Sequence, residues 1–307
     1  MERPNVSKQR FLIVTLLNVL ITVVEIIGGL LSGSLALLSD AFHNMGDSFS
    51  IILGYVAQQL SGKSENRRQT YGYRRAEILS ALTNSLLLLV IAIFLIGEAI
   101  QRLGHPEHIN GRLMLIVAVI GLLANFASAF LLHSGSYDSL NVKATYLHVL
   151  SDALSSVAVI IGGIILSFVN VSWLDPLLTI GVAIYIGFEA LPIISQTIKI
   201  LMQSSPDLDY DKITTDLKAV AGVNDVHHVH AWMIDENHII FSAHLNCDDL
   251  RLSEVEEIYS QVEKILREKY HICHITIQAE CSRGRDENLF NTPVDEQHMI
   301  NDKNTTK

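Results

Sequence analysis

Six long runs of apolar residues occupy the first two thirds of this 307-residue chain. A helix needs about 20 residues to cross the roughly 30 Å hydrocarbon core of a bilayer, and each run reaches that length. The first run is too long for a cleavable signal peptide and lacks a small-residue cleavage pattern. We therefore expect six transmembrane helices, near residues 11–32, 35–60, 77–101, 113–133, 145–169 and 173–201.

Basic residues are concentrated on one side of the expected helices. Loops that stay in the cytosol carry an excess of Lys and Arg, so this asymmetry sets the orientation. The other side has only Arg102 and Arg112. Both termini are thus predicted to lie in the cytosol, as are the basic residues Arg3, Lys8, Arg10, Lys63, Arg67, Arg68, Arg74, Arg75, Lys143 and Lys199.

The chain changes character after the last run. Residues 1–202 hold 12 basic and 12 acidic side chains, whereas residues 203–307 hold 10 basic and 20 acidic ones. An acidic domain of this kind argues against nucleic-acid binding, which needs a basic face. It suits a soluble domain that tolerates or recruits cations.

Periodicity predicts a small α+β domain in this acidic part. Amphipathic helices are expected over 204–222 and 253–270, and strands over 225–234, 238–247 and 271–280. The order αββαβ indicates a helix-on-sheet layer with an antiparallel pair. The expected domains are a cytosolic N-terminus 1–10, a transmembrane domain 11–202, a cytosolic metal-binding and dimerisation domain 203–282, and a disordered tail 283–307.

Two identically spaced polar pairs interrupt the apolar runs. They are His43-x-x-x-Asp47 in the second run and His148-x-x-x-Asp152 in the fifth. On a helix, residues four apart share a face, so each pair aims an imidazole and a carboxylate in one direction. Ionisable residues inside a membrane span are expensive and are functional by default.

Two such pairs facing each other would form an N2O2 cage that suits tetrahedral Zn2+. Two carboxylates neutralise the charge of the ion, and two neutral imidazoles complete the shell. Metal binding requires neutral imidazole, so loading the cage expels protons and emptying it readmits them. The pairs therefore predict exchange of Zn2+ for H+ by a cage that opens alternately to each side.

Two further carboxyl groups lie in the expected spans. Asp40 shares the helix face of His43 and Asp47, and it fits either an entry path for metal or a contact with a neighbouring helix. Glu25 lies in the middle of the first span. It fits either pairing with another polar side chain or a place on a water or proton path.

Histidines are crowded in the predicted strands of the cytosolic domain. Alternation along a strand places His244 and Glu280 away from the apolar core. It also places His230 on the outer side and His227 nominally on the core side, unless a bulge intervenes near 226–228. A second metal site is expected at His244 and Glu280 with His227, or with His230 as the substitute.

Several motifs together resemble the cation diffusion facilitator family over residues 11–281. They are SLALLSDAFHNMGD, TYGYRRAEILSALTN, HVLSD, WLDP and VHHVHAW…SAHL…ITIQAE, in that order. The resemblance implies a homodimer of six-helix protomers with a metallochaperone-like (ferredoxin-like) cytosolic domain. It implies proton-coupled export of a divalent metal from the cytosol, with the transport site on His43, Asp47, His148 and Asp152. It favours His227 over His230.

The His/Asp combination is similar to the zinc-type branch, with Cd2+ or Co2+ as further passengers, and to bacterial members in the cell membrane. Zn2+ is then substrate and also a structural or regulatory ion of the cytosolic domain, with no other cofactor. Two other readings are a membrane-embedded zinc metallohydrolase and a metal sensor without transport. No H-E-x-x-H motif supports the hydrolase, so we expect no enzyme activity.

Overall fold

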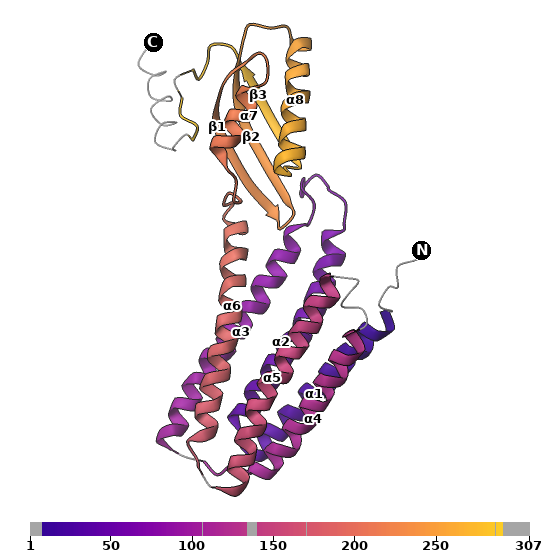
Figure 1. The fold of residues 1–307 in the computed structure, drawn as a ribbon, viewed down its shortest axis with the longest axis vertical. Helices are drawn as coiled ribbons and strands as arrows, with labels where there is room; N and C mark the ends of the chain where they lie inside the picture. Colours follow the sequence, from indigo (N-terminus) through magenta and orange to yellow (C-terminus); the bar gives the residue numbers. More distant parts are fainter. Residues whose placement is uncertain (1–7, 106, 134–139, 170, 286, 291–307) are drawn as a thin grey trace. The chain divides into compact units, whose positions relative to one another are not determined.

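Six long helices come first in the chain, and a small domain of helices and strands follows (Figure 1). The structure is a computed structural model that describes residues 8–105, 107–133, 140–169, 171–285 and 287–290. The helices are α1 (Lys8–Ser32), α2 (Leu35–Ser61), α3 (Arg75–Gly104), α4 (Gly111–His133), α5 (Leu140–Phe168) and α6 (Leu174–Leu201). Two compact units result, one of Met1–Leu60 with Leu79–Ser195 and one of Ser61–Ile78 with Gln196–Lys307.

The helical unit turns large apolar side chains outward and small ones inward. Phe94 on α3, Phe130 on α4 and Phe188 on α6 are 67%, 80% and 70% exposed. Ala99 on α3 and Ala118 on α4 are buried. A soluble protein would bury the phenylalanines, so this distribution fits a surface that faces hydrocarbon.

The helices occupy the six predicted places. Among the described residues, four segments are long and apolar enough to cross a membrane: Ile13–Ser32, Arg75–Gly104, Gly111–Leu131 and Leu174–Leu201. α2 is not one of them, and the apolar stretch described in α5 is the shorter Ser156–Phe168. α2 carries the first His/Asp pair and α5 carries the second.

Glycines let α1 and α5 approach α4 closely. A Cβ added at Gly28 of α1 would lie 2.6 Å from Cγ2 of Val117, and one added at Gly163 of α5 would lie 3.2 Å from Cα of Leu115. Small residues at such positions allow the close backbone contacts on which helix packing in membranes depends.

The N-terminus of α2 is held by a carboxylate from α6. Asp175 accepts hydrogen bonds from Ser34 Oγ at 2.5 Å, from Leu35 N at 2.8 Å and from Ala36 N at 3.3 Å. The side chain is fully buried. The first turn of a helix has unpaired N–H groups and a partial positive charge, so a buried carboxylate there stabilises it.

Replacing Asp175 with Ala should leave these donors buried without an acceptor. We expect a loss of about 2 kcal/mol, or several degrees in Tm, measured by thermal denaturation of the detergent-solubilised protein. Glu107→Ala is the control, because Glu107 is 59% exposed and its ion pair with Arg102 lies at the surface. Equal Tm values for the two variants would contradict the capping role.

The second unit contains α7 (Tyr210–Lys218), β1 (Val223–Asp235), β2 (His238–Cys247), α8 (Leu252–Tyr270) and β3 (His274–Glu280). The sheet order is β1-β2-β3, with β1 antiparallel and β3 parallel to β2. Apolar residues of both helices and the strands form one core, which includes Leu217, Phe241 and Leu266. The predicted αββαβ order and its antiparallel pair are confirmed.

Residues just after β3 depart from the prediction of a disordered tail over 283–307. Val229 N on β1 donates to the carbonyl of Leu289 at 2.8 Å, and the ring of Phe290 lies edge-on against Tyr210 with centroids 5.0 Å apart. β1 lies at the edge of the sheet, and Leu289 packs against the core of the domain, which explains why this stretch folds onto it. Residues 286 and 291–307 lie outside the described residues, so for them disorder stays a prediction.

Candidate metal centres

α2 and α5 bring an imidazole and two carboxylates together in the helical unit. His43 Nε2 lies 3.2 Å from Asp152 Oδ1 of α5 and 3.9 Å from Asp47 Oδ2, one turn further along α2. His43 and Asp152 are buried, and Asp47 is partly buried. One ligand atom from each residue lies within 4.8 Å of the others, which is close enough to hold one metal ion.

The fourth predicted ligand, His148, belongs to α5 and precedes Asp152 by one helical turn. Its side chain lies outside the described residues. The structure therefore brings three of the four predicted ligands together. For the fourth, His148, the only guide is its four-residue spacing from Asp152.

Asp40 contacts the opposite helix one turn before His43. Its Oδ2 accepts a hydrogen bond of 3.0 Å from Ser156 Oγ of α5, and Ser156 also donates to the carbonyl of Asp152. Asp40 is buried. This contact with a neighbouring helix is one of the two roles expected for Asp40, and it ties α2 to α5 beside the candidate site.

Glu25 of α1 is fully buried and joins α2 next to the site. Asn44, which follows His43 in the chain, donates a 2.8 Å hydrogen bond to Glu25 Oε2. Within the described part of the chain, Glu25 Oε1 has no hydrogen-bond partner. Glu25 thus pairs with a polar side chain, which is one of its two expected roles. Only one of its two carboxylate oxygens is used in this pairing among the described residues.

Ser156 and Asn44 are residues of this site that sequence analysis missed. Both carry a usable signal, since Ser156 follows Asp152 by one helical turn and Asn44 adjoins His43. Tyr185 of α6 also lies near, with its ring centroid 6.4 Å from that of His43. No spacing in the sequence links α6 to the pairs.

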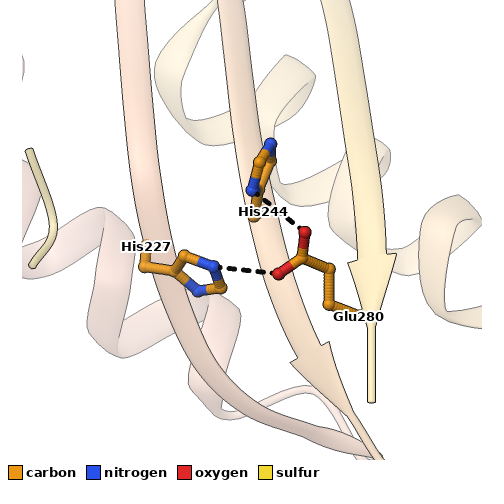
Figure 2. Close-up of side chains that lie close together, drawn as sticks. All are labelled: His227, His244 and Glu280. Carbon is orange, nitrogen blue, oxygen red and sulfur yellow. Dashed lines mark hydrogen bonds and ion pairs between the residues drawn. The ribbon is translucent and has the colours of Figure 1, made fainter. Parts of the chain in front are cut away.

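The second centre lies on the sheet of the cytosolic domain (Figure 2). His227 of β1 and His244 of β2 both face Glu280 at the end of β3. His227 Nε2 lies 3.2 Å from Glu280 Oε2, and His244 Nδ1 lies 3.3 Å from Glu280 Oε1. The imidazole of His227 is fully buried. Three different strands thus deliver one ligand each.

A bulge in β1 puts His227 in this group. The register with β2 shifts between His227 and His230, and His228 has the left-handed φ of 51°. The extra residue reverses the alternation that placed His227 on the core side. His230 is exposed and lies outside the ligand group among the described residues.

The electrostatics of the centre suit a cation. Burial lowers the pKa of His244, and the neighbouring His228 and His227 lower it further against the opposing effect of Glu280. The neutral imidazole that binds metal is therefore favoured. His227 Nδ1 is buried with no hydrogen-bond partner among the described residues. Two imidazoles and a carboxylate are a donor set that fits Zn2+.

Two family models match the chain in succession. The cation efflux transmembrane domain matches residues 11–202, and the cytoplasmic domain of cation efflux proteins matches residues 205–282. The chain belongs to the cation efflux family. Each candidate metal centre lies within one of the two matched regions.

Curated members of the cation efflux family are similar over most of their length. The cadmium, cobalt and zinc/H(+)-K(+) antiporter of Bacillus subtilis (strain 168) is 37% identical over 272 residues, 87% of each chain. The zinc transporter ZitB of Pectobacterium atrosepticum is 35% identical over 284 residues, 92% of this chain and 88% of its own. The metal cation efflux system protein CzcD of Cupriavidus metallidurans is 33% identical, covering 91% and 88%.

Membership of the cation efflux family settles the class of protein. The chain is a multi-pass membrane protein of bacterial type, with a transmembrane domain and a cytoplasmic dimerisation domain built around a small sheet. It is a cation efflux transporter and not an enzyme. The resemblance stated from the sequence motifs is confirmed.

Replacing His227 with Ala should lower the metal bound per purified chain by about one equivalent, because the cytosolic centre loses one of its three described ligands. His230→Ala is the matched control, since His230 lies on the same strand but is exposed. Elemental analysis after dialysis against a fixed free Zn2+ concentration measures the difference. A loss in the His230 variant with none in the His227 variant would reverse the assignment.

Proposed function

We propose that this protein exports Zn2+ from the cytosol in exchange for protons, and that Cd2+ and Co2+ are further substrates. His43, Asp47, His148 and Asp152 hold the metal inside the membrane. The observation that carries the proposal is the 3.2 Å approach of His43 Nε2 to Asp152 Oδ1 between two helices of the helical unit. Burying an imidazole and carboxylates in such surroundings costs free energy, so their presence there indicates a function.

The ligand set accounts for both binding and release. Two carboxylates balance the double charge of Zn2+, so the loaded site is neutral in hydrocarbon. Imidazole and carboxylate bind zinc without the strength of four thiolates, which suits a carrier that must let its substrate go. Protons compete for the same imidazoles, so an inward proton gradient favours release on the far side.

The names of the relatives agree with this proposal. The Bacillus subtilis relative is named as an antiporter that takes cadmium, cobalt and zinc and uses protons and potassium. The relative from Pectobacterium atrosepticum is named as a zinc transporter. We infer that zinc is a substrate here too, and that protons move in the opposite direction.

Six transmembrane helices, with both termini in the cytosol of a bacterial cell, complete the proposed architecture. α2 and α5 cross the membrane with the other four and carry the polar pairs. We infer a homodimer joined through the cytosolic domains. Metal at His227, His244 and Glu280 neutralises part of an acidic domain, which lowers the repulsion between two copies.

Glu25 and Asp40 belong to the path beside the site in this proposal. Asp40 follows the face of His43 and Asp47 along α2, and Glu25 reaches the same helix through Asn44. A buried carboxyl oxygen without a partner is an acceptor available to a water or a proton. Glu25 is therefore assigned to the proton path and Asp40 to the metal path.

Asp152→Ala should abolish zinc flux into inside-out proteoliposomes, because the cage loses a charge-balancing ligand. His105→Ala is the control, as an exposed loop residue away from the site. A fluorescent zinc indicator in the lumen reports flux, and a pH dye reports counter-movement of protons. Zinc uptake by the parent protein without any pH change would rule out proton exchange, and undiminished flux in the Asp152 variant would rule out the site.

Glu25→Gln should weaken the proton side of the cycle while leaving zinc binding intact. The amide keeps the shape of the side chain and the contact with Asn44 but cannot carry a proton. We expect at least about a tenfold loss of zinc-driven proton movement, comparable to the loss of one proton-transfer group. Glu98→Gln, which alters a carboxyl paired with Arg102, is the control. Normal proton movement in the Glu25 variant would remove Glu25 from the path.

A further inference from the structure

The residues after β3 fold back across the cytosolic metal centre. We call residues 282–285 and 287–290 the C-terminal strap. Its backbone accepts hydrogen bonds from Val229 N through the carbonyl of Leu289 and from Asn246 Nδ2 through the carbonyl of Arg283, at 2.8 and 2.7 Å. Leu289 also packs against the core of the domain. These contacts hold the strap at both ends, with the metal centre beneath its middle.

Gly284 brings the strap backbone directly onto two of the ligands. Its φ is +68°, a conformation that favours glycine. A Cβ added there would clash with His227 Nε2 and would lie 2.9 Å from Glu280 Oε2. Only a residue without a side chain allows the strap to pass this close, so the strap forms one wall of the centre.

Glu287 points a carboxylate at the same centre. Its Oε2 lies 4.0 Å from His227 Nε2 and 4.0 Å from His228 Nδ1. Three ligands from the strands leave one position of a tetrahedral zinc site to be filled. With bonds of about 2.0–2.2 Å, neighbouring ligand atoms of a tetrahedral site lie roughly 3.3–3.6 Å apart. Glu287 lies outside the three residues whose ligand atoms are all within 4.8 Å of one another, so its carboxylate has to move further into the centre to become the fourth ligand.

His228 is the competing candidate for the fourth position, and its geometry disfavours it. Its ring stacks on that of His244, with centroids 4.5 Å apart and planes 10° from parallel. The lone pairs of imidazole lie in the ring plane. Two parallel, stacked rings therefore direct their lone pairs side by side and do not converge on one ion.

We propose that Glu287 is the fourth ligand of the cytosolic metal centre and that metal binding draws it in and stabilises the C-terminal strap in its place over the centre. The proposal rests on the metal centre assigned under the proposed function. The stability of the strap then depends on metal. The bond from Glu287 to the metal and the backbone contacts of the strap with β1 reinforce one another. Without metal, only the backbone and apolar contacts hold it.

The test uses the full-length protein with Asp152→Ala, so that the cytosolic centre is measured without the transport site. Glu287→Gln keeps the shape of the side chain and removes its charge and most of its ligand strength. We expect zinc affinity, measured by competition with a chelating dye, to fall at least about tenfold, as for the loss of supporting groups around a metal. Glu257→Gln, an exposed carboxyl on α8, should leave affinity unchanged.

Two further readouts separate a ligand from a merely structural residue. The absorption spectrum of bound Co2+ should change in Glu287→Gln and return to a four-coordinate pattern in Glu287→His, which supplies an imidazole at the same place. Hydrogen exchange at residues 226–232 should slow when Zn2+ is added to the parent and not in Glu287→Gln, because Val229 N–H is bonded to the strap. A chain ending at Cys281 should lose the same protection.

Unchanged affinity, Co2+ spectrum and exchange in Glu287→Gln would overturn the proposal. Absence of any zinc binding in the Asp152→Ala parent would overturn the cytosolic centre itself and the fourth ligand with it. Neither result affects zinc flux by the unmutated protein, which tests the transport proposal independently.

Discussion

A buried imidazole facing carboxylates between two apolar helices is the interaction on which the helical unit depends. Ionisable groups in hydrocarbon cost several kcal/mol unless they are paired or bound to a cation. His43 and Asp152 therefore require α2 and α5 to stay adjacent, and the bond from Ser156 to Asp40 reinforces that contact. Asp175 fixes the start of α2 from α6, and Asn44 ties its middle to Glu25 of α1. The helix that carries the first pair is thus held by three others.

Local patterns account for the parts that could be predicted. The helices follow from runs of apolar residues long enough to cross a bilayer. In β2, alternation correctly placed His244 on the side away from the core, which holds Phe241 and Leu245. The His/Asp spacing correctly joined His43 with Asp47, because helix geometry alone decides that two residues four apart share a face.

Contacts between distant segments could not be predicted from such patterns. Asp175 meets Ser34 across 141 positions of the chain, and nothing in either neighbourhood indicates the other. The position of His227 depends on a bulge whose residue His228 has positive φ and whose register is set by pairing with β2. Strict alternation would have excluded His227, and only a family resemblance favoured it. The assignment of His148 as a metal ligand depends on the spacing in the sequence alone.

The two candidate metal centres differ in the structural elements that carry their ligand residues. Every predicted ligand of the membrane centre lies on a long helix, so its geometry changes only when α2 and α5 themselves shift. In the cytosolic centre, the three described ligands lie on a paired sheet that resists such shifts. Glu287 lies instead on the strap, which contacts that sheet through a few bonds. Under our proposals, metal at the candidate cytosolic centre acts on the strap while the strands stay in place, whereas metal at the candidate membrane centre acts on the helices that carry it.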